Sequence, residues 1–363
     1  MAGLGTALEL LKLDRSIDVT LFDKKGYVGA NTVCGGAISS FMLRELKMEL
    51  PGHVVASEIR RVQIYGPNGE CWQLESGNEV YGYVLWRDKF ESYLAEQVAE
   101  LDGKMRMNSE IKDLSELSEY DYIIGADGLT GVTNKILHSP FPPLEDVHVA
   151  AQRISQLSHS KDTMELYFGS RYAPKGYAWI LPEGNKKARI GLGVPLSLKL
   201  NPTKLLDRFM KELVADRMSK AKSKLIPTTK PPKRLVFGNL VLVGDAAYLT
   251  DPLTGGGIVQ AILSGKYAAK AISEGKPEKY DSYCRGLKRR NLMRYRLKRI
   301  LYDFSDEDFN QMIDAVKDFK PKLTRISWAM AHAILTLGMK KPRLFTKHKI
   351  LRKIINVNDR IKL

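Results

Sequence analysis

The segment Leu242–Gly257 (LVGDAAYLTDPLTGGG) constrains the fold of this chain more than any other part of its sequence. The apolar residues from Leu235 to Val243 predict a strand. Gly244 and Asp245 follow this strand directly, and three consecutive glycines then lead into a helical pattern from Gly257 to about Glu274. A glycine-rich linker would not be expected to combine a strand, an acid and a helix in this order.

This order of elements predicts that the backbone cradles a flat ring with a negative edge. Glycine has no Cβ, so the backbone at Gly255–Gly257 can lie directly against such a ring. The first N–H groups of the helix have no partner within it, and a helix N-terminus carries roughly half a positive charge. The N1 and C2-carbonyl edge of a reduced flavin is negative, and the Asp245 carboxylate can accept a hydrogen bond from a ribityl hydroxyl. The segment therefore favours a flavin site.

The amino-terminal residues predict half of a dinucleotide-binding unit. Such a unit needs a strand, a Gly-x-Gly-x-x-Gly turn that opens a helix, and an acid about 20 residues later. Here Ala2–Leu13 is helical with Gly3 and Gly5 near its start, and the strand Asp18–Asp23 ends on an acid that suits ribose hydroxyls. The first strand and two glycines of the pattern are absent. We expect Met1 to be a mis-called or truncated beginning, with a β-branched strand ending in Gly-x-Gly encoded upstream.

The other periodicities predict alternating helices and strands. Tyr122–Gly125 is a short apolar strand that runs into a Gly-Ala-Asp-Gly turn. Further expected elements are short strands over Glu58–Gly82 around the turn Gly66–Gly69, a helix over Arg87–Leu101, a β-rich segment over Val147–Pro195, a helix from Pro202 to about Met218, and a largely helical remainder.

Charge is the unusual feature of the composition, because the net charge is +16. Arg285–Arg299 holds eight Lys/Arg and no acid, and Lys340–Leu363 holds nine against one acid. Such clusters suit an anionic membrane surface or a phosphorylated ligand, or they are only a solvated surface. No nucleic-acid-binding motif accompanies them, so we expect no nucleic-acid partner.

Neither a membrane span nor a metal site is expected. The longest apolar candidate, Ile326–Met339, is shorter than the about 20 residues that a spanning helix needs, and it is better interpreted as a buried or surface-lying helix. Cys34, Cys71 and Cys284 have no metal-ligand spacing and suggest no disulfide framework. We expect a cytoplasmic protein that is peripheral on the inner membrane face.

Taken together, Ala2–Asp23, Arg87, Gly125–Gly128 and Gly244–Ile258 resemble the FAD-dependent hydroxylase superfamily of flavoproteins over roughly residues 1–275. One departure is Gly131, where many members have Ser. The resemblance implies that FAD is the cofactor and assigns positions around it. It implies contacts to FAD from Ala2, Gly3, Asp23 (ribose), Cys34, Gly35, Ala37, Arg87 (pyrophosphate), Ile111 (adenine, through its backbone), Asp127, Asp245, Gly257 and Ile258.

Two further stretches are similar to the geranylgeranyl reductases. Val33–Ser39 (VCGGAIS) resembles their Cys-Gly-Gly loop, and Pro174–Pro182 (PKGYAWILP) resembles their Pro-x-x-Tyr-x-Trp-x-Phe-Pro signature, with Leu181 in place of Phe. On a strand, Tyr177, Trp179 and Leu181 share one face and could form an aromatic wall for an isoprenoid chain. This resemblance implies hydride transfer from reduced FAD to a prenyl C=C bond in archaeal-type ether phospholipid precursors, with Cys34, Tyr177 and Trp179 as the catalytic candidates.

The fold expected from these patterns and the resemblance is mixed α/β. A Rossmann-like FAD-binding domain is interleaved with a β-sheet substrate domain, and a helical basic C-terminal region follows. The expected boundaries are residues 1–55, 83–146 and 233–280 for the FAD-binding domain, 56–82 and 147–232 for the substrate domain, and 281–363 for the C-terminal region.

Alternatives remain open at this point. Halogenases carry Gly-Trp-x-Trp-x-Ile-Pro, which Gly176–Pro182 partly matches, so a flavin-dependent halogenase or monooxygenase is the second enzyme reading. An inactive isoprenoid-lipid-binding protein is the third. No second dinucleotide fingerprint is present, so the sequence does not distinguish NAD(P)H, ferredoxin or another external electron donor. Cys34 is either a proton donor or a small loop residue.

Overall fold

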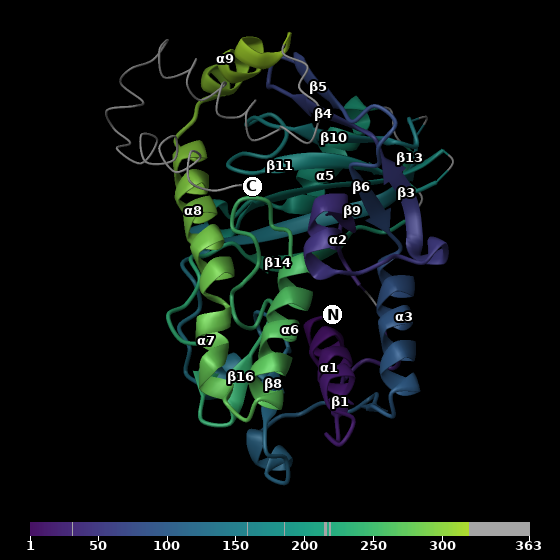
Figure 1. The fold of residues 1–363 in the computed structure, drawn as a ribbon. Helices are drawn as coiled ribbons and strands as arrows, with labels where there is room; N and C mark the ends of the chain where they lie inside the picture. The colour runs from purple at the N-terminus through teal and green to yellow at the C-terminus, as the bar shows by residue number, and fades with distance from the viewer. Residues whose placement is uncertain (31, 158, 185, 214–215, 218, 319–363) are drawn as a thin grey trace.

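The computed structural model describes residues 1–318 apart from 31, 158, 185, 214–215 and 218. The predicted helix Ile326–Met339 and the basic segment Lys340–Leu363 lie outside the described residues. A lower body of helices and short strands lies beneath a large sheet, and the mixed α/β fold predicted from the sequence is confirmed (Figure 1).

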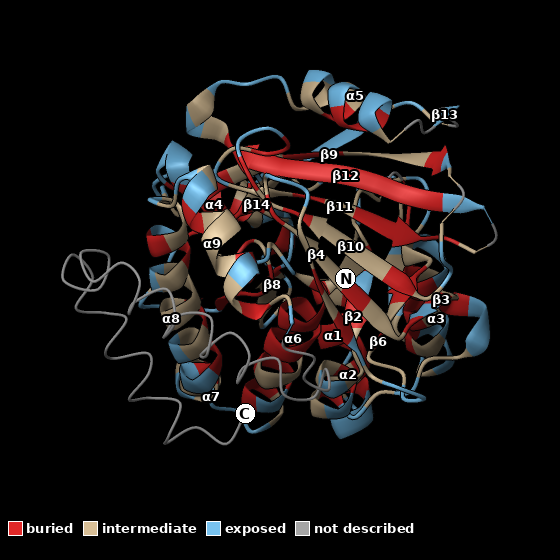
Figure 2. Ribbon diagram, turned by 90° about the horizontal axis from the view of Figure 1, so that it is seen from above, coloured by how far each residue is buried: buried red, intermediate tan, exposed pale blue. Residues whose placement is uncertain are grey.

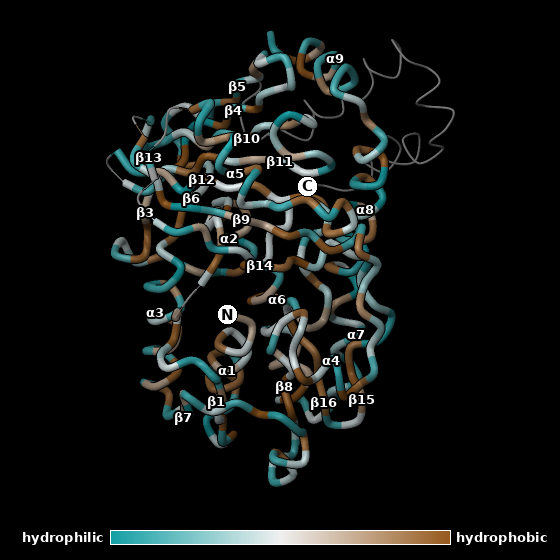
Figure 3. The backbone as a smooth tube through the Cα atoms, turned by 180° about the vertical axis from the view of Figure 1, so that it is seen from behind, coloured by the Kyte–Doolittle hydropathy of each residue, from teal (hydrophilic) through white to brown (hydrophobic). Residues whose placement is uncertain are grey.

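Two helices distant in sequence, α1 (Ala2–Leu13) and α6 (Ile258–Ser273), pack along each other in the lower body. Glycines allow the close approach. A Cβ on Gly5 would lie 3.3 Å from the Cα of Ile262, and a Cβ on Gly265 would lie 2.8 Å from the Thr6 hydroxyl oxygen. Hydrophobic residues gather on α1 and on the strands beside it, so this pair of helices forms the base of the core (Figure 3).

Short strands flank this helix pair. Strand β1 (Thr20–Phe22) pairs parallel with β7 (Lys104–Arg106), and β8 (Ile123–Gly125) pairs parallel with β16 (Leu240–Leu242). The strand predicted over Leu235–Val243 is wrong as a single element. It is a hairpin in which β15 (Val236–Phe237) pairs antiparallel with β16, because Gly238 adopts a φ of +62° and turns the chain.

An eight-stranded sheet forms the upper body. Its order is β13-β9-β12-β11-β10-β4-β5, with β14 also paired to β9. The strands of this sheet come from two separate stretches of sequence, residues 61–75 and 147–227. Their bounds are β4 (Arg61–Tyr65), β5 (Cys71–Glu75), β9 (Val147–Gln156), β10 (Thr163–Tyr167), β11 (Tyr177–Pro182), β12 (Lys187–Pro195), β13 (Asp216–Arg217) and β14 (Lys222–Pro227). The predicted domain boundaries stay predictions.

Helix α5 (Pro202–Glu212) covers one face of this sheet, and its inward residues Leu206 and Phe209 are buried (Figure 2). The predicted helix end near Met218 is wrong. The helix stops at Glu212, and Asp216–Arg217 instead pair with the edge of β9, where the strand satisfies their backbone groups.

Smaller elements join the two bodies. A three-stranded sheet has the order β2 (Ala37–Ser39), β6 (Gly82–Leu85) and β3 (Val55–Ile59). The remaining helices and turns are α2 (Ser40–Leu46), η1 (Gly52–Val54), α3 (Arg87–Glu100), η2 (Leu114–Leu117), α4 (Val132–Ile136), η3 (Leu144–Asp146), η4 (Leu196–Leu198), η5 (Pro277–Lys279), α7 (Tyr280–Tyr283), α8 (Arg285–Leu301) and α9 (Asp306–Val316).

Helix α8 carries the first basic cluster, and five of its eight cations form ion pairs with acids from elsewhere in the chain. Their acidic partners are Asp281, Glu45, Asp251, Asp146 and Glu145. Most of the basic side chains of α8 therefore hold the helix against the rest of the protein through ion pairs. Among the described residues, no helix is both long and apolar enough to cross a membrane.

Candidate active site

A cavity of about 2600 Å³ lies between the lower body and the face of the large sheet opposite α5. Every residue that the sequence predicted for the site lines it, although these residues are far apart in the chain. They are Ala2, Gly3, Asp23, Cys34, Gly35, Ala37, Arg87, Ile111, Asp127, Tyr177, Trp179, Asp245, Gly257 and Ile258. Their individual roles stay predictions.

The amino-terminal ends of α1 and α6 open onto this cavity. Neither Met1 nor Gly257, the residues that precede these helices, makes a side-chain cap, so the first N–H groups of both helices are available to a ligand. The glycine run before α6 leaves room for a flat ring against the backbone. The two helix ends make this part of the cavity attractive to negative charge.

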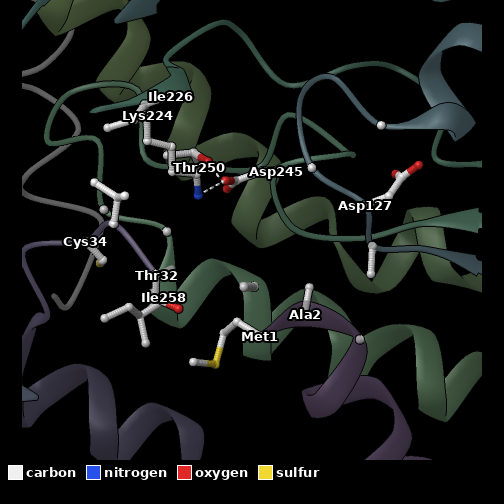
Figure 4. Close-up of a pocket in the computed structure, with 18 of the residues that line it drawn as sticks. Met1, Ala2, Thr32, Cys34, Asp127, Lys224, Ile226, Asp245, Thr250 and Ile258 are labelled. Carbon is white, nitrogen blue, oxygen red and sulfur yellow. Dashed lines mark hydrogen bonds and ion pairs between the residues drawn. The ribbon is translucent and has the colours of Figure 1, made fainter. Parts of the chain in front are cut away.

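The Asp245 carboxylate lies beside the start of α6 and already has two partners. Its Oδ2 atom is 2.9 Å from the Lys224 Nζ, and its Oδ1 atom accepts a hydrogen bond from the Thr250 hydroxyl at 2.7 Å (Figure 4). Burial opposes ionisation of Asp245, but the Lys224 charge and the Thr250 hydrogen bond outweigh it and lower its pKa. The group is therefore a carboxylate that can still accept a further hydrogen bond.

Arg87, at the first position of α3, forms an ion pair with Glu91 at 2.5 Å, and both side chains are nearly buried. The Nε of Arg87 is buried and has no hydrogen-bond partner in the described part of the chain. An unpaired buried guanidinium N–H costs free energy unless a ligand accepts from it. This orphaned donor fits a phosphate oxygen, which is where the resemblance places the pyrophosphate.

The loop Cys34–Gly36 is held from the large sheet by two side chains. Arg189 on β12 donates through Nη1 to the carbonyl oxygen of Gly35 at 2.7 Å, and Gln152 on β9 donates to that of Cys34 at 3.1 Å. Arg189 is in turn paired with the fully buried Glu183. The sheet therefore fixes the position of a loop that belongs to the lower body.

Cys34 itself has a perturbed thiol. Burial would raise its pKa, but the Arg87 guanidinium and the Gly36 N–H, 3.4 Å from Sγ, shift the pKa below the ordinary value. Charges that face the cavity therefore make this thiol a stronger acid than an ordinary cysteine.

Tyr177, Trp179 and Leu181 of β11 all face the cavity, as the period of a strand requires. The Tyr177 hydroxyl donates to the carbonyl oxygen of Thr254 at 2.5 Å, which ties this strand to the glycine run. The rings of Tyr177 and Trp179 lie 5.7 Å apart. Apolar residues complete the chamber beside them: Val62, Ile64, Met164, Leu166, Phe168, Leu301, Phe304 and Phe309.

Trp179 lies flat on β12 because position 191 has no side chain. A Cβ on Gly191 would come within 2.4 Å of the Trp179 ring. The indole Nε1 is buried without a hydrogen-bond partner among the described residues, although an indole N–H normally finds one.

At the other end of the cavity, Asp23 and Ile111 mark the side expected to bind the adenosine, and Asp127 also lines the cavity. The Asp23 Oδ1 accepts from the Lys25 N–H at 3.0 Å, and the Asp127 carboxylate accepts from the N–H and hydroxyl of Thr133 at the start of α4. A Cβ at Gly131 would lie 2.1 Å from the Asp127 carboxyl carbon. Glycine at position 131, where many family members have Ser, therefore leaves room for the Asp127 carboxylate beside the start of α4.

Sequence reasoning missed three residues of the site: Lys224, Arg189 and Gln152. Each lies on a strand of the large sheet whose local pattern is ordinary, and each matters only because that sheet meets the lower body. The alternation of side chains along β9 and β12 could have shown which residues share a face of the sheet. It could not have shown that this face packs against the lower body.

Three comparisons with known proteins agree with this geometry. The model of the geranylgeranyl reductase catalytic domain matches residues 146–228, which hold β9 to β14. Digeranylgeranylglycerophospholipid reductase of Thermoplasma acidophilum is 30% identical over 350 residues, covering 82% of this chain and 85% of that protein. The protein of the same name from Picrophilus torridus is 29% identical, covering 84% and 87%.

Solved structures share the fold. A geranylgeranyl bacteriochlorophyll reductase-like protein from Thermoplasma acidophilum superimposes with a TM-score of 0.83 at 25% identity, covering 96% of each chain. A flavin-dependent brominase superimposes with a TM-score of 0.67 at 14% identity, covering 99% of this chain and 96% of its own, and shows the fold alone. The sequence match to the reductases covers most of this chain and most of each relative, whereas the brominase shares only the fold. This chain therefore belongs to the geranylgeranyl reductase family of flavin-dependent oxidoreductases.

Proposed function

We propose that this chain binds FAD and saturates C=C bonds of geranylgeranyl chains in archaeal-type ether phospholipid precursors. The observation that carries the proposal is a single cavity that joins the glycine run at Gly255–Gly257, the Cys34–Gly36 loop and the Tyr177–Trp179 wall. The names of relatives that match over most of the chain support the substrate class.

The residues present fit FAD. The unpaired Nε of Arg87 suits the pyrophosphate, Asp245 suits a ribityl hydroxyl, and the uncapped start of α6 suits the ring edge that is negative after reduction. When bound, reduced FAD supplies the hydride that the alkene receives.

The protein's own contribution is a dry and oriented pocket. The aromatic wall and the apolar residues around it exclude water and hold the alkene beside the site expected for the ring. The Cys34 thiol faces the same space and is the candidate to deliver the proton that completes saturation.

Membrane association and electron supply complete the proposal. Arg285, Arg289 and Arg296 of α8 form no ion pair within the described part of the chain, and they are available to anionic headgroups. We also propose a peripheral location on the inner membrane face and an external donor, either NAD(P)H or ferredoxin.

The test is anaerobic reduction of a prenyl lipid. Purified enzyme with a verified FAD content is reduced with dithionite and mixed with digeranylgeranylglycerophosphate, and flavin reoxidation is followed together with the product mass. Each saturated bond adds two hydrogens. The fully saturated lipid is the control substrate and should leave the flavin reduced.

A variant separates the substrate wall from the cofactor site. Trp179→Ala should retain FAD and lose most of the rate, since it opens the chamber without touching the glycine run. Reduced, FAD-loaded enzyme that leaves every prenyl lipid unchanged but halogenates or hydroxylates an aromatic substrate would instead favour the halogenase or monooxygenase alternative.

A further inference from the structure

A second pocket of about 240 Å³ adjoins the main cavity, and the residues Lys175 and Tyr302 line both. Three cations surround it: Lys175 from the loop before β11, and Arg296 and Arg299 from α8. Ser197 of η4 adds a hydroxyl. The pocket is therefore a polar extension of an otherwise apolar chamber.

The cations of this pocket are not balanced by its acids. Glu145 is committed to Arg299, with Nη1 and Oε1 2.5 Å apart, and Asp303 is the other carboxylate of the lining. Lys175 and Arg296 are exposed, and neither the ammonium nor the guanidinium has a hydrogen bond or ion pair in the described structure. Two free cations at the mouth of a hollow favour an anion.

A buried hydrogen-bond network holds the side chain of Tyr302 in place. His148 has polar partners at both ring nitrogens: Nδ1 lies 2.8 Å from the Thr228 hydroxyl, and Nε2 lies 2.7 Å from the Tyr302 hydroxyl and 3.3 Å from the carbonyl oxygen of Lys175. The Thr228 hydroxyl in turn donates to the carbonyl oxygen of Asp146 at 3.1 Å. Lys298 and Asp146 close the network with a buried ion pair at 2.7 Å. This network fixes the position of Tyr302, which lines both the pocket and the chamber.

Strand β9 connects this wall with the Cys34 loop. His148, Ala150 and Gln152 alternate onto the cavity face, and Gln152 bonds the carbonyl oxygen of Cys34. Four residues of extended strand span roughly 13 Å. A chain-like ligand could therefore place its polar end at the pocket and an interior part of its apolar chain beside Cys34.

The surface around the pocket is apolar. Phe141, Leu144 and Leu200 are 46%, 47% and 40% exposed, and they lie on or next to the turns η3 and η4, which contact each other. Glu145 and Ser197 of the same two turns line the pocket. Large exposed apolar side chains beside free cations are typical of a surface that meets lipid.

We propose that this pocket binds the phosphate at the polar end of the prenyl substrate, through Lys175 and Arg296, and so positions the chain along β9. The inference rests on the proposed function for the identity of the chain. Two ligands carry this chemistry, namely the phosphate of a glycerophospholipid headgroup and the diphosphate of a free prenyl alcohol.

The test measures binding to the oxidised, FAD-loaded enzyme, so no turnover is needed. Digeranylgeranylglycerophosphate, geranylgeranyl diphosphate and uncharged geranylgeraniol are titrated against the wild type and against Lys175→Gln/Arg296→Gln. The matched control is Lys187→Gln/Lys222→Gln, which removes the same charge from exposed positions of the large sheet outside both cavities.

We expect the pocket variant to bind at least one phosphorylated ligand about tenfold or more weakly, as the loss of charge-assisted hydrogen bonds implies, with geranylgeraniol unchanged. The ligand with the larger loss identifies the source of the phosphate. The control variant should bind all three as the wild type does.

Several outcomes would overturn the proposal: wild-type affinity that is equal for phosphorylated and uncharged ligands, no binding of any of them, or equal loss in both variants. A protein that reduces prenyl lipids without depending on Lys175 and Arg296 keeps the proposed function and removes this pocket. A protein that shows the expected binding but no reduction keeps the pocket and removes the function.

Discussion

The Nη1 of Arg189 lies 2.7 Å from the carbonyl oxygen of Gly35, so one strand of the large sheet directly holds the loop at the centre of the candidate active site. The same guanidinium is paired with Glu183, whose side chain is 1% exposed. A single buried side chain therefore links the substrate wall to the loop expected beside the flavin.

Replacing Arg189 with Met should destabilise the protein by about 3–5 kcal/mol, because it leaves the buried Glu183 carboxylate unpaired. Urea unfolding measures the change. The double variant Arg189→Met/Glu183→Leu should recover part of the loss, since both charges are then removed. A matched single change at the more exposed pair, Arg153→Met, should cost much less. If Arg189→Met is no more destabilising than Arg153→Met, the buried pair of Arg189 and Glu183 does not stabilise the fold.

Asp245→Ala should weaken FAD binding by about 1–3 kcal/mol, or roughly fivefold to 150-fold, because it removes the acceptor at the start of α6 and leaves Lys224 without its partner. Fluorescence titration of the apoprotein with FAD checks this. Asp127→Ala removes a carboxylate that is occupied by Thr133, so a smaller loss is expected there. Equal affinity of Asp245→Ala and the wild type would show that Asp245 does not contact the cofactor.

Gly191→Ala should displace Trp179, since the new Cβ would lie within 2.4 Å of its ring. Overpacking of this kind costs about 1–3 kcal/mol of stability. The indole should move into the chamber and slow the reduction of the prenyl substrate. FAD affinity should not change. Gly193→Ala is the control on the same face of β12, because its Cβ would meet only the Ala150 methyl at 4.0 Å. Similar effects of the two substitutions would contradict the proposed packing.

His148 gives the stability a predictable pH dependence. Burial and the nearby charge of Lys298 lower its pKa to about 4. The unfolded chain, with an ordinary pKa of about 6.5, therefore binds more protons between these values, and stability must fall as the pH drops through this window. The loss should reach at most about 3 kcal/mol.

Chemical unfolding from about pH 7 to pH 4 checks this expectation. His148→Gln should flatten that part of the profile, because it removes the titrating imidazole. A variant whose stability falls as steeply as that of the wild type would assign the pH dependence to other groups.

The sequence by itself determined the local elements and the chemistry of each motif. The helix Ala2–Leu13 was predicted with the bounds that the structure shows, because its alanine and leucine residues favour a helix. The face shared by Tyr177, Trp179 and Leu181 followed from the period of a strand. Glycine-rich turns at strand ends predicted where the cofactor lies in the cavity, because few residues other than glycine permit such close backbone approach. The boundary errors near Met218 and within Leu235–Val243 arose where strand pairing, a non-local interaction, decided the backbone conformation.

Only the tertiary structure decided which distant residues meet. Lys224 is paired with Asp245, and Arg189 with the Cys34 loop, because the large sheet lies against the lower body, and no local pattern encodes that contact. The same holds for the charge of α8. The sequence shows eight cations without an acid, whereas the fold supplies five acidic partners from four other segments. Electrostatic roles depend on distances in space, and the fold brings together charges that lie up to about 250 residues apart, so the free cations of the second pocket could be recognised only once their neighbours were paired.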